Sequence, residues 1–389
     1  MPKQDPTPVF QCQVTTTVKL TIERSTLLKS LGHVQSVVER RNTIPILSNV
    51  RLQARDGVLA LNATDMDLEV VKSIPASVER DGATTAPAHT LFEIVKKLPD
   101  GCQVEMSWDS ERNQMTLRSG RSRFSLSCLP VEEFPTMEEG GYSHTFAVSS
   151  SDIQSLVDRT RFAISTEETR YYLNGIYLHT AVVDGNPALR AVATDGHRLA
   201  KAEIALPEGA ADMPGVIVPR KTVSELRKLM EEGNADVSVS LSTSRIRFVL
   251  GSAVLTSKLI EGTYPDYEQV IPHNNDLHLE VDKKLFSDAV DRVSTVSGDK
   301  HRTIKVRIED GSLTLSASNA EAGNAQEEVE CIYSAQPLEI GFNSRYLLDI
   351  MSQIEGSAAR LSMADTASPA IIRESADDTA VYVLMPVRV

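Results

Sequence analysis

The chain has 389 residues, of which 41% are hydrophobic and 24% are charged, and its formal net charge is −13 at pH 7. This length and composition predict a globular protein of several domains and exclude a disordered or fibrous one. The acidic balance argues against a simple basic nucleic-acid-binding domain. No stretch approaches the roughly 18 apolar residues of a membrane span, and the start of the chain lacks the apolar core of a signal peptide. We therefore expect a cytoplasmic protein.

Residues 1–18 are interpreted as a flexible tail, because proline, glutamine and other polar residues dominate them. Beyond the tail, an Asp-Gly pair flanked by alternating apolar residues occurs at 56–57, 184–185 and 310–311. Each occurrence predicts a β-hairpin, since Asp-Gly suits a turn with positive φ and the flanks alternate with a period of two. The even spacing of the three pairs indicates an internal triplication of about one domain length.

The surroundings of the hairpins repeat as well. A short strand and a helix precede each hairpin, with Ser25, Ser151 and Asp282 as the expected N-caps of the three helices. A second strand–helix unit and another pair of strands follow each hairpin. The sequence therefore predicts an α+β fold of three repeated domains, at residues 19–144, 145–275 and 276–389.

The stretch ATDGHRLA (193–200) has the residue types of a catalytic loop. Its ATD portion also occurs at 63–65 in the first copy, so it is interpreted as scaffold, and only GHRL is peculiar to the middle copy. His197 and Asp195 could be a base and its orienting carboxylate, but no GxSxG motif supplies a nucleophile. The four cysteines and eight histidines show no metal-ligand spacing. No catalytic residue, metal or cofactor is predicted, and an enzyme that uses His197 is kept as a remote alternative.

Several motifs are specific enough to compare with known families: RYYLNG (170–175), ATDGHRLA, VPRK (218–221), YPDY (264–267) and VYVLMPVRV (381–389). With the three repeats, they resemble the bacterial sliding clamp family, the beta subunit of DNA polymerase III, over the chain from about residue 19 onward. The resemblance implies a non-catalytic processivity factor. It implies a head-to-tail homodimer closed into a ring, with helices lining a central hole and antiparallel sheets outside.

Such a ring encircles double-stranded DNA without sequence preference and is placed there by an ATP-driven clamp loader. It tethers DNA polymerases and repair proteins that carry a clamp-binding peptide. The alternative function is a peptide-binding interaction scaffold that is not loaded on DNA. Charge reversal at Arg41, Arg220 and Lys221 separates the two functions, because only the clamp would lose DNA retention.

The resemblance also implies a pocket between the second and third domains that binds a short hydrophobic peptide, often ending in Leu-Phe. Apolar side chains suit an adaptable groove, while Arg198 and the backbone of Gly196 would fix polar groups of the peptide. The residues carried over to this pocket are Leu173, Thr194, Gly196, His197, Arg198, Leu199, Pro265, Val270, Asn343, Tyr346, Val383, Met385, Pro386, Val387 and Arg388. Gln269 stands where related clamps commonly carry arginine, which weakens the expectation of a salt-bridged rim on that side.

Contact with DNA is expected from the helices and from a few residues near them. The six predicted helices together carry a net charge of +4 and the rest of the chain carries −17, which suits phosphate contact within an acidic shell. A general preference of helices for lysine and arginine accounts for part of this segregation. The resemblance assigns DNA contacts to Arg41, Tyr171, Tyr172, Arg220 and Lys221. Tyr172 could equally be a core residue, because strand alternation would turn one of the tyrosine pair inward.

Two stretches have the pattern of open sheet edges that pair between subunits. RSGRSRFSL (118–126) alternates arginine with apolar residues, and EAGNAQEEVE (321–330) supplies glutamates. Open edges invite pairing and opposite charges select the partner, whereas two solvated edges are the alternative. The predicted dimer-interface residues are Arg121, Arg123, Phe124, Leu126, Val296, Glu321, Glu327 and Glu328.

Overall fold

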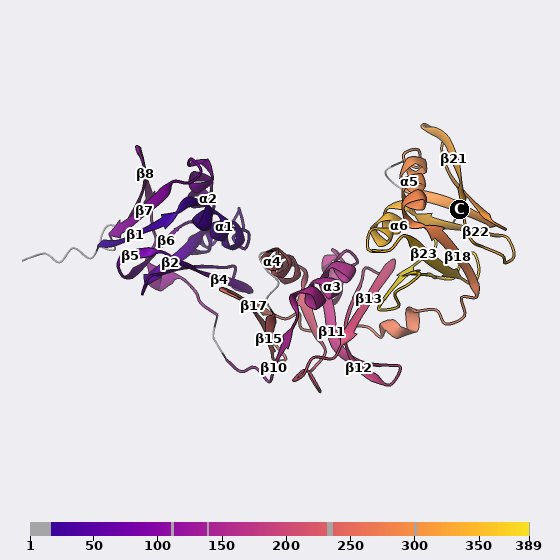
Figure 1. The fold of residues 1–389 in the computed structure, drawn as a ribbon, viewed down its shortest axis with the longest axis horizontal. Helices are drawn as coiled ribbons and strands as arrows, with labels where there is room; N and C mark the ends of the chain where they lie inside the picture. The colour runs from indigo at the N-terminus through magenta and orange to yellow at the C-terminus, as the bar shows by residue number, and fades with distance from the viewer. Residues whose placement is uncertain (1–16, 110–112, 138–139, 232–235, 299–301, 389) are drawn as a thin grey trace, which may run out of the picture. The chain divides into compact units, whose positions relative to one another are not determined.

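The structure is a computed structural model that describes residues 17–109, 113–137, 140–231, 236–298 and 302–388 (Figure 1). Residues 1–16 of the predicted tail lie outside the described residues, and the first strand begins at Thr17, inside the predicted tail. The chain divides into two compact units. The first comprises residues 1–139 and 251–256, and the second comprises residues 140–250 and 257–389.

The same order of elements occurs three times: strand, helix, three strands, strand, helix, three strands. In the first copy these are β1 (Thr17–Glu23), α1 (Arg24–Gln35), β2 (Asn49–Arg55), β3 (Val58–Thr64), β4 (Leu68–Pro75), β6 (Gly82–Pro87), α2 (Ala88–Lys97), β7 (Gln103–Asp109), β8 (Gln114–Ser119) and β9 (Ser122–Ser127), with β5 (Ser77–Arg80) added after β4. Short 3₁₀ helices η1 (Pro45–Ser48) and η2 (Val131–Glu133) precede β2 and follow β9.

The second copy contains β10 (His144–Val148), α3 (Ser150–Arg161), β11 (Gly175–Val183), β12 (Asn186–Thr194), β13 (Arg198–Ala205), β14 (Val216–Pro219), α4 (Arg220–Met230), β15 (Val237–Leu241), β16 (Arg245–Leu250) and β17 (Ala253–Lys258). It also has 3₁₀ helices η3 (Glu168–Leu173) and η4 (Tyr267–Val270). The third copy contains β18 (Leu277–Asp282), α5 (Lys283–Ser294), β19 (Thr303–Glu309), β20 (Ser312–Asn319), β21 (Gly323–Glu330), β22 (Leu338–Asn343), α6 (Ser344–Met351), β23 (Ala358–Met363), β24 (Ala370–Glu374) and β25 (Ala380–Leu384).

All three predicted hairpins are confirmed, as β2–β3, β11–β12 and β19–β20. In the first two, the aspartate and the glycine of the turn both have positive φ, as a tight two-residue turn requires (Asp56 49°, Gly57 77°, Asp184 48°, Gly185 81°). The sequence predicted a pair of strands in each of these groups, which is one strand too few. A third strand follows in each case, so each of these groups has three strands.

The turn into that third strand is built the same way in each copy. The Oδ1 atoms of Asp65, Asp195 and Asn319 each accept two backbone N–H bonds, from the residues two and three positions later. Such local side-chain bonds define an Asx turn. The interpretation of ATD as shared scaffold is therefore confirmed.

Of the three predicted N-caps, one is confirmed and two are wrong. Asp282 caps α5 by accepting from the N–H of Leu285. In α1, the carboxylate of Glu23 accepts from the N–H groups of Ser25 and Thr26. In α3, Ser149 takes the capping place instead of Ser151. Both caps lie two residues earlier than predicted, because strand and helix are separated by no residue at α1 and by one residue at α3.

In the second unit, one eight-stranded antiparallel sheet runs in the order β14-β11-β12-β13-β25-β24-β23-β18. Strands β13 and β25 join the second and third copies, with Ala200 opposite Tyr382. This continuous pairing explains why these two copies form one compact unit. Helices α3 and α4 pack against β11, β12 and β13 from one side (Figure 1). The predicted α+β class is thus confirmed. Within the described residues, no helix is both long and apolar enough to cross a membrane.

Candidate functional site

The turn between β12 and β13 holds the GHRL residues by local bonds. Thr194 Oγ1 accepts from the N–H of Gly196 at 3.1 Å and donates to the carbonyl of Arg198 at 2.7 Å. Asp195 Oδ1 accepts from the N–H groups of His197 and Arg198 at 2.9 and 3.0 Å. Its Oδ2 accepts from Arg198 Nε at 3.1 Å. The Asp195 carboxylate therefore fixes the turn and does not orient the His197 ring as a catalytic base requires.

Two features favour glycine at position 196. Its φ of 88° lies in the left-handed region that favours glycine. A Cβ atom at this position would also lie 2.6 Å from Nη1 of Arg170. The backbone of Gly196 is thus left exposed beside His197, as a site that presents backbone groups to a ligand requires.

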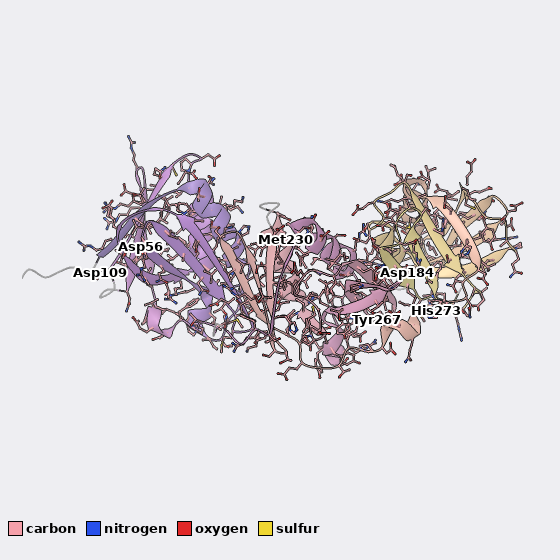
Figure 2. The ribbon with its side chains drawn as sticks, turned by 60° about the horizontal axis from the view of Figure 1, so that its bottom comes forward. Asp56, Asp109, Asp184, Met230, Tyr267 and His273 are labelled. Carbon is pink, nitrogen blue, oxygen red and sulfur yellow. The ribbon has the colours of Figure 1, made fainter. Side chains whose placement is uncertain are left out.

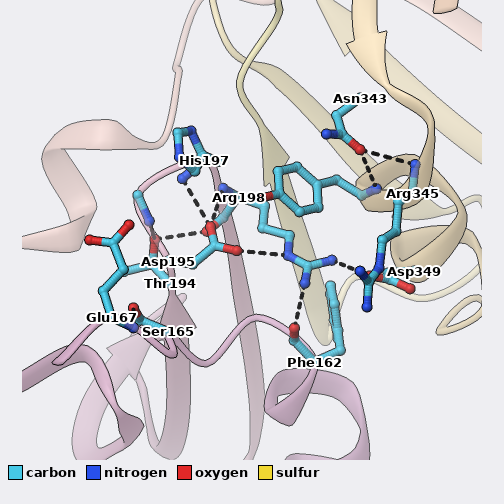
Figure 3. A network of polar contacts seen from close by, with 12 residues as sticks. Phe162, Ser165, Glu167, Thr194, Asp195, His197, Arg198, Asn343, Arg345 and Asp349 are labelled. Atoms are coloured by element: carbon cyan, nitrogen blue, oxygen red, sulfur yellow. Dashed lines mark hydrogen bonds and ion pairs between the residues drawn. The ribbon is translucent and has the colours of Figure 1, made fainter. Parts of the chain in front are cut away.

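The Arg198 side chain joins the second copy to the third (Figure 3). Its Nη1 donates to Asp349 Oδ2 at 2.6 Å, and its Nη2 donates to the carbonyl of Phe162 at 2.7 Å. The guanidinium also lies 4.4 Å from the ring centre of Tyr346 and 5.1 Å from that of Phe162. With 10% of the side chain exposed, three of its five N–H groups are already used within the protein. The side chain therefore links the two copies, which the sequence did not suggest.

The C-terminal segment is fixed beside the same turn. The N–H of Met385 donates to the carbonyl of His197 at 2.9 Å, and the N–H of Val387 donates to the carbonyl of Gly341 at 2.9 Å. Asn343 caps α6 by accepting from the N–H groups of Arg345 and Tyr346. This cap places the Tyr346 ring parallel to His197, with ring centres 6.1 Å apart and 21° between the planes.

Three of the predicted pocket residues form a buried apolar base. Leu173, Leu199 and Val383 belong to a single buried cluster. Val270 and Met385 are exposed to 50% and 41%. The remaining members are partly or well exposed: Thr194, Gly196, His197, Arg198, Pro265, Asn343, Tyr346, Pro386, Val387 and Arg388. Gln269 carries no charge, so it cannot form an ion pair at this rim, and its amide donates to Asp266 at 2.9 Å within its own segment.

Four of the five predicted DNA-contact residues come together in the second copy. Gly175 of β11 pairs with Pro219 of β14, which brings the end of η3 beside the start of α4. Tyr171 is 55% exposed, whereas Tyr172 packs against the buried cluster. Both tyrosines lie in the 3₁₀ helix η3, so the expected strand is wrong. One ring, that of Tyr172, nevertheless turns inward as predicted. Arg220 and Lys221 are the first two residues of α4. Arg41 is exposed in the loop after α1, in the first unit.

Both predicted interface stretches are edge strands of their sheets, β9 in the first unit and β21 in the second. Arg121 lies in the turn before β9 and Glu321 in the turn before β21, so neither is a strand residue as expected. Leu126 is buried in its own unit, while Arg123 and Glu328 are exposed. The remaining interface candidates are the half-buried Phe124 and Val296, and Glu327, which pairs with Arg292 at 2.5 Å.

The comparisons with known proteins cover almost the whole chain. Family descriptions of the N-terminal, central and C-terminal domains of the DNA polymerase III beta subunit match residues 18–138, 147–266 and 268–388. The Beta sliding clamp of Caulobacter vibrioides is 54% identical over 372 residues, covering 96% of this chain and all of that protein. The chain belongs to the DNA polymerase III beta subunit family.

Solved structures of beta sliding clamps agree with this family assignment. A crystal structure of the clamp of Caulobacter crescentus with polyethylene glycol bound superposes with a TM-score of 0.93 at 53% identity, covering 96% of this chain and all of that chain. The clamp of Bartonella birtlesii bound to griselimycin gives a TM-score of 0.93 at 50% identity over the same shares. The Beta sliding clamp of Escherichia coli is 37% identical over 372 residues, which cover 95% of this chain and all of that protein.

The resemblance to beta sliding clamps predicted the residues of the peptide-binding surface but not the residues that hold them in place. Phe162, Asp349 and Arg170 contact the site residues and were not predicted. Phe162 and Asp349 lie on elements distant from residue 198 in the sequence, and no local pattern marks them. No group of three or more His, Cys, Asp or Glu side chains that could hold a metal occurs among the residues described.

Proposed function

We propose that this chain is a processivity factor for DNA replication, a homodimeric ring that encircles duplex DNA and slides along it in the bacterial cytoplasm. The observation that carries the proposal is the full-length match of three family domains in order, at 54% identity to a beta sliding clamp. The protein is non-catalytic in this account. The Asp195 carboxylate, the best candidate for an orienting group, is occupied by backbone N–H groups and by Arg198.

The surface around residues 194–199 and 383–388 is proposed to bind the hydrophobic peptides of DNA polymerases, clamp loader and repair proteins. Its buried base of Leu173, Leu199 and Val383 and its exposed Met385 suit an apolar peptide end. The exposed backbone at Gly196 offers groups for the peptide main chain. Because Arg198 is held by Asp195 and Asp349, we assign it to the support of this surface rather than to direct recognition.

Contact with DNA is proposed for Arg41, Tyr171, Tyr172, Arg220 and Lys221. An enclosed duplex needs only weak attraction that does not depend on sequence, and a few cations near phosphate supply it. The dimer is proposed to close through β9 of one subunit and β21 of its partner. Both are open edges, and arginine near β9 faces glutamate on β21 in such a pair.

Primer extension on a long single-stranded circle tests the proposed function. With clamp loader, ATP and the replicative polymerase present, addition of this chain should lengthen the products of a single binding event many-fold. A variant with His197 and Met385 both changed to alanine should lose the lengthening, because the polymerase loses its attachment. Unchanged product length with the wild-type chain would contradict the clamp and favour the peptide-binding scaffold, provided a known clamp lengthens products in the same assay.

A further inference from the structure

The face of the large sheet opposite α3 and α4 carries one row of charged and polar groups across three strands. The register places His179 of β11 opposite Arg190 of β12, and Arg190 opposite Glu203 of β13. Arg190 Nε donates to Glu203 Oε2 at 2.9 Å. Arg190 is only 8% exposed although it sits on a sheet face, so something covers it.

The cover is the connector, which we define as residues 264–271 between β17 and β18. Tyr264 stacks on Tyr177 of β11, with ring centres 4.7 Å apart and 7° between the planes. Three residues further on, Tyr267 reaches the row of polar groups, and its neighbour Glu268 accepts from Arg190 Nη1 at 2.5 Å. The connector is thus attached at two points, one aromatic and one polar. Tyr267, at the polar point, is labelled in Figure 2.

The hydrogen bonds around Tyr267 have one consistent direction. His179 Nδ1 lies 2.8 Å from the carbonyl oxygen of Thr180, which can only accept, so Nδ1 carries the proton. His179 Nε2 is then the acceptor for the Tyr267 hydroxyl at 2.9 Å. The hydroxyl oxygen accepts in turn from Arg190 Nη1 at 2.9 Å. The Tyr267 hydroxyl thus bonds to both His179 and Arg190, and the Tyr267 residue is 6% exposed.

The connector also belongs to the base of the proposed peptide-binding surface. Tyr264, Tyr267 and Ile271 share one buried cluster with Leu173, Leu199 and Val383. Pro265 and Val270 alternate with these anchors in the chain and remain exposed. A shift of the connector would therefore move two rim residues and disturb the apolar base at the same time.

We infer that the hydrogen-bonded set of Tyr267, His179 and Arg190 is a positioning device for peptide binding, which holds the connector so that Pro265 and Val270 stand at the rim. None of the three side chains contacts the peptide in this account. The inference rests on the proposed peptide-binding function. Its specific content is that a hydroxyl group buried away from the rim sets the affinity at the rim.

Replacement of Tyr267 by phenylalanine in the full-length chain tests the inference, because it removes only the hydroxyl. The probe is a fluorescein-labelled hydrophobic peptide ending in Leu-Phe, and its Kd is measured by fluorescence anisotropy. The loss of one buried hydrogen-bonded group predicts a Kd about five- to tenfold higher than that of the wild type. Amide hydrogen exchange in residues 264–271 should become faster, while the dimer dissociation constant stays unchanged.

Tyr382→Phe is the matched control. The Tyr382 hydroxyl is buried and has no hydrogen-bond partner among the described residues, and its ring contacts the ring of Phe162. Its removal should change neither the peptide Kd nor exchange in the connector.

Three results would count against the account, each at a different step. Unchanged exchange in Tyr267→Phe overturns the anchoring of the connector. Faster exchange with an unchanged peptide Kd overturns the positioning role. Failure of the wild-type chain to bind the probe overturns the proposed peptide site, while the exchange comparison still decides whether Tyr267 anchors the connector.

Discussion

Arg198 Nη1 donates to Asp349 Oδ2 at 2.6 Å, which joins residues 151 positions apart in the second and third copies. The same guanidinium is bonded to Asp195 and to the carbonyl of Phe162. The turn that carries the proposed peptide-binding surface is therefore tied to both copies through one side chain. The proposed peptide-binding surface therefore depends on the contact between the second and third copies.

Asp349→Asn should destabilise the second unit, because Arg198 is 10% exposed and loses one of its two charged partners, keeping only Asp195. Asp349 itself is 36% exposed, so we expect a loss of about 1–2 kcal/mol in the free energy of unfolding, between the values of surface and buried pairs. Urea unfolding followed by circular dichroism measures the change. Asp378→Asn is the control, since Asp378 is 86% exposed and 3.4 Å from Arg373. Equal losses in the two variants would refute the structural role of the Arg198–Asp349 pair.

Gly196→Ala should weaken peptide binding by about tenfold, since the alanine is strained at φ of 88° and its Cβ displaces Arg170. Gly185→Ala is the control: its φ of 81° gives the same strain, but among the described residues no atom beyond its two chain neighbours lies within 4 Å of the added Cβ. Both variants should lose about 1 kcal/mol of stability, and only Gly196→Ala should lose peptide affinity. Anisotropy with the labelled peptide separates them. Equal peptide affinity in the two variants would remove Gly196 from the site.

The connector should loosen as the pH falls through the acid range. Burial holds the pKa of His179 below its usual range, against the hydrogen bond to the Thr180 carbonyl, which raises this pKa; the charges of Arg190 and Lys201 lower it further and that of Glu268 raises it. The unfolded chain then binds more protons than the folded chain between the two pKa values, so stability is complete above the ordinary histidine pKa of about 6.5 and is lost as the pH drops. Protonation also removes the acceptor for the Tyr267 hydroxyl.

Hydrogen exchange in residues 264–271 at a series of pH values, corrected for intrinsic rates, measures this loosening. Protection should fall below about pH 6 in the wild type. His179→Gln lacks the titrating group and should show a flat profile across that interval. An identical acid loss in this variant would assign the pH dependence to another group.

The proposed dimer contact can be tested by exchanging charges. Arg123→Glu places a negative charge opposite Glu328 on the partner edge. The dimer dissociation constant should rise at least tenfold, because the variant loses an attraction and also gains a repulsion. Glu328→Arg in the same chain restores opposite charges, since Glu328 is exposed on β21. Sedimentation velocity of the single and double variants measures both. A double variant that is no more dimeric than Arg123→Glu would argue against this pairing of edges.

Local chemistry made part of the fold predictable. The Asp-Gly turns at 56–57, 184–185 and 310–311 and the Asp282 cap depend on neighbouring residues, and all four are confirmed. The caps of α1 and α3 were missed because several polar residues compete at each helix start. At α1 the longer Glu23 side chain reaches the free N–H groups.

Pairings between distant parts of the chain could not be read from local patterns. Strand β25 could pair with any open edge of the right hydrophobicity, and only the folded sheet shows that it joins β13. The bonds of Tyr267 to His179 and Arg190 span 88 and 77 positions. The YPDY motif containing Tyr267 was recognised by resemblance, but its role as an anchor becomes visible only when the connector lies on the sheet.

The central claim is that the chain is linked to DNA topologically. The most direct measurement loads the protein onto nicked circular DNA with clamp loader and ATP, washes at high salt, and then cuts the circle once. The account predicts that the protein stays on the circle through the wash and is released when the DNA becomes linear. Equal retention on circular and linear DNA would show ordinary electrostatic binding and would contradict the ring.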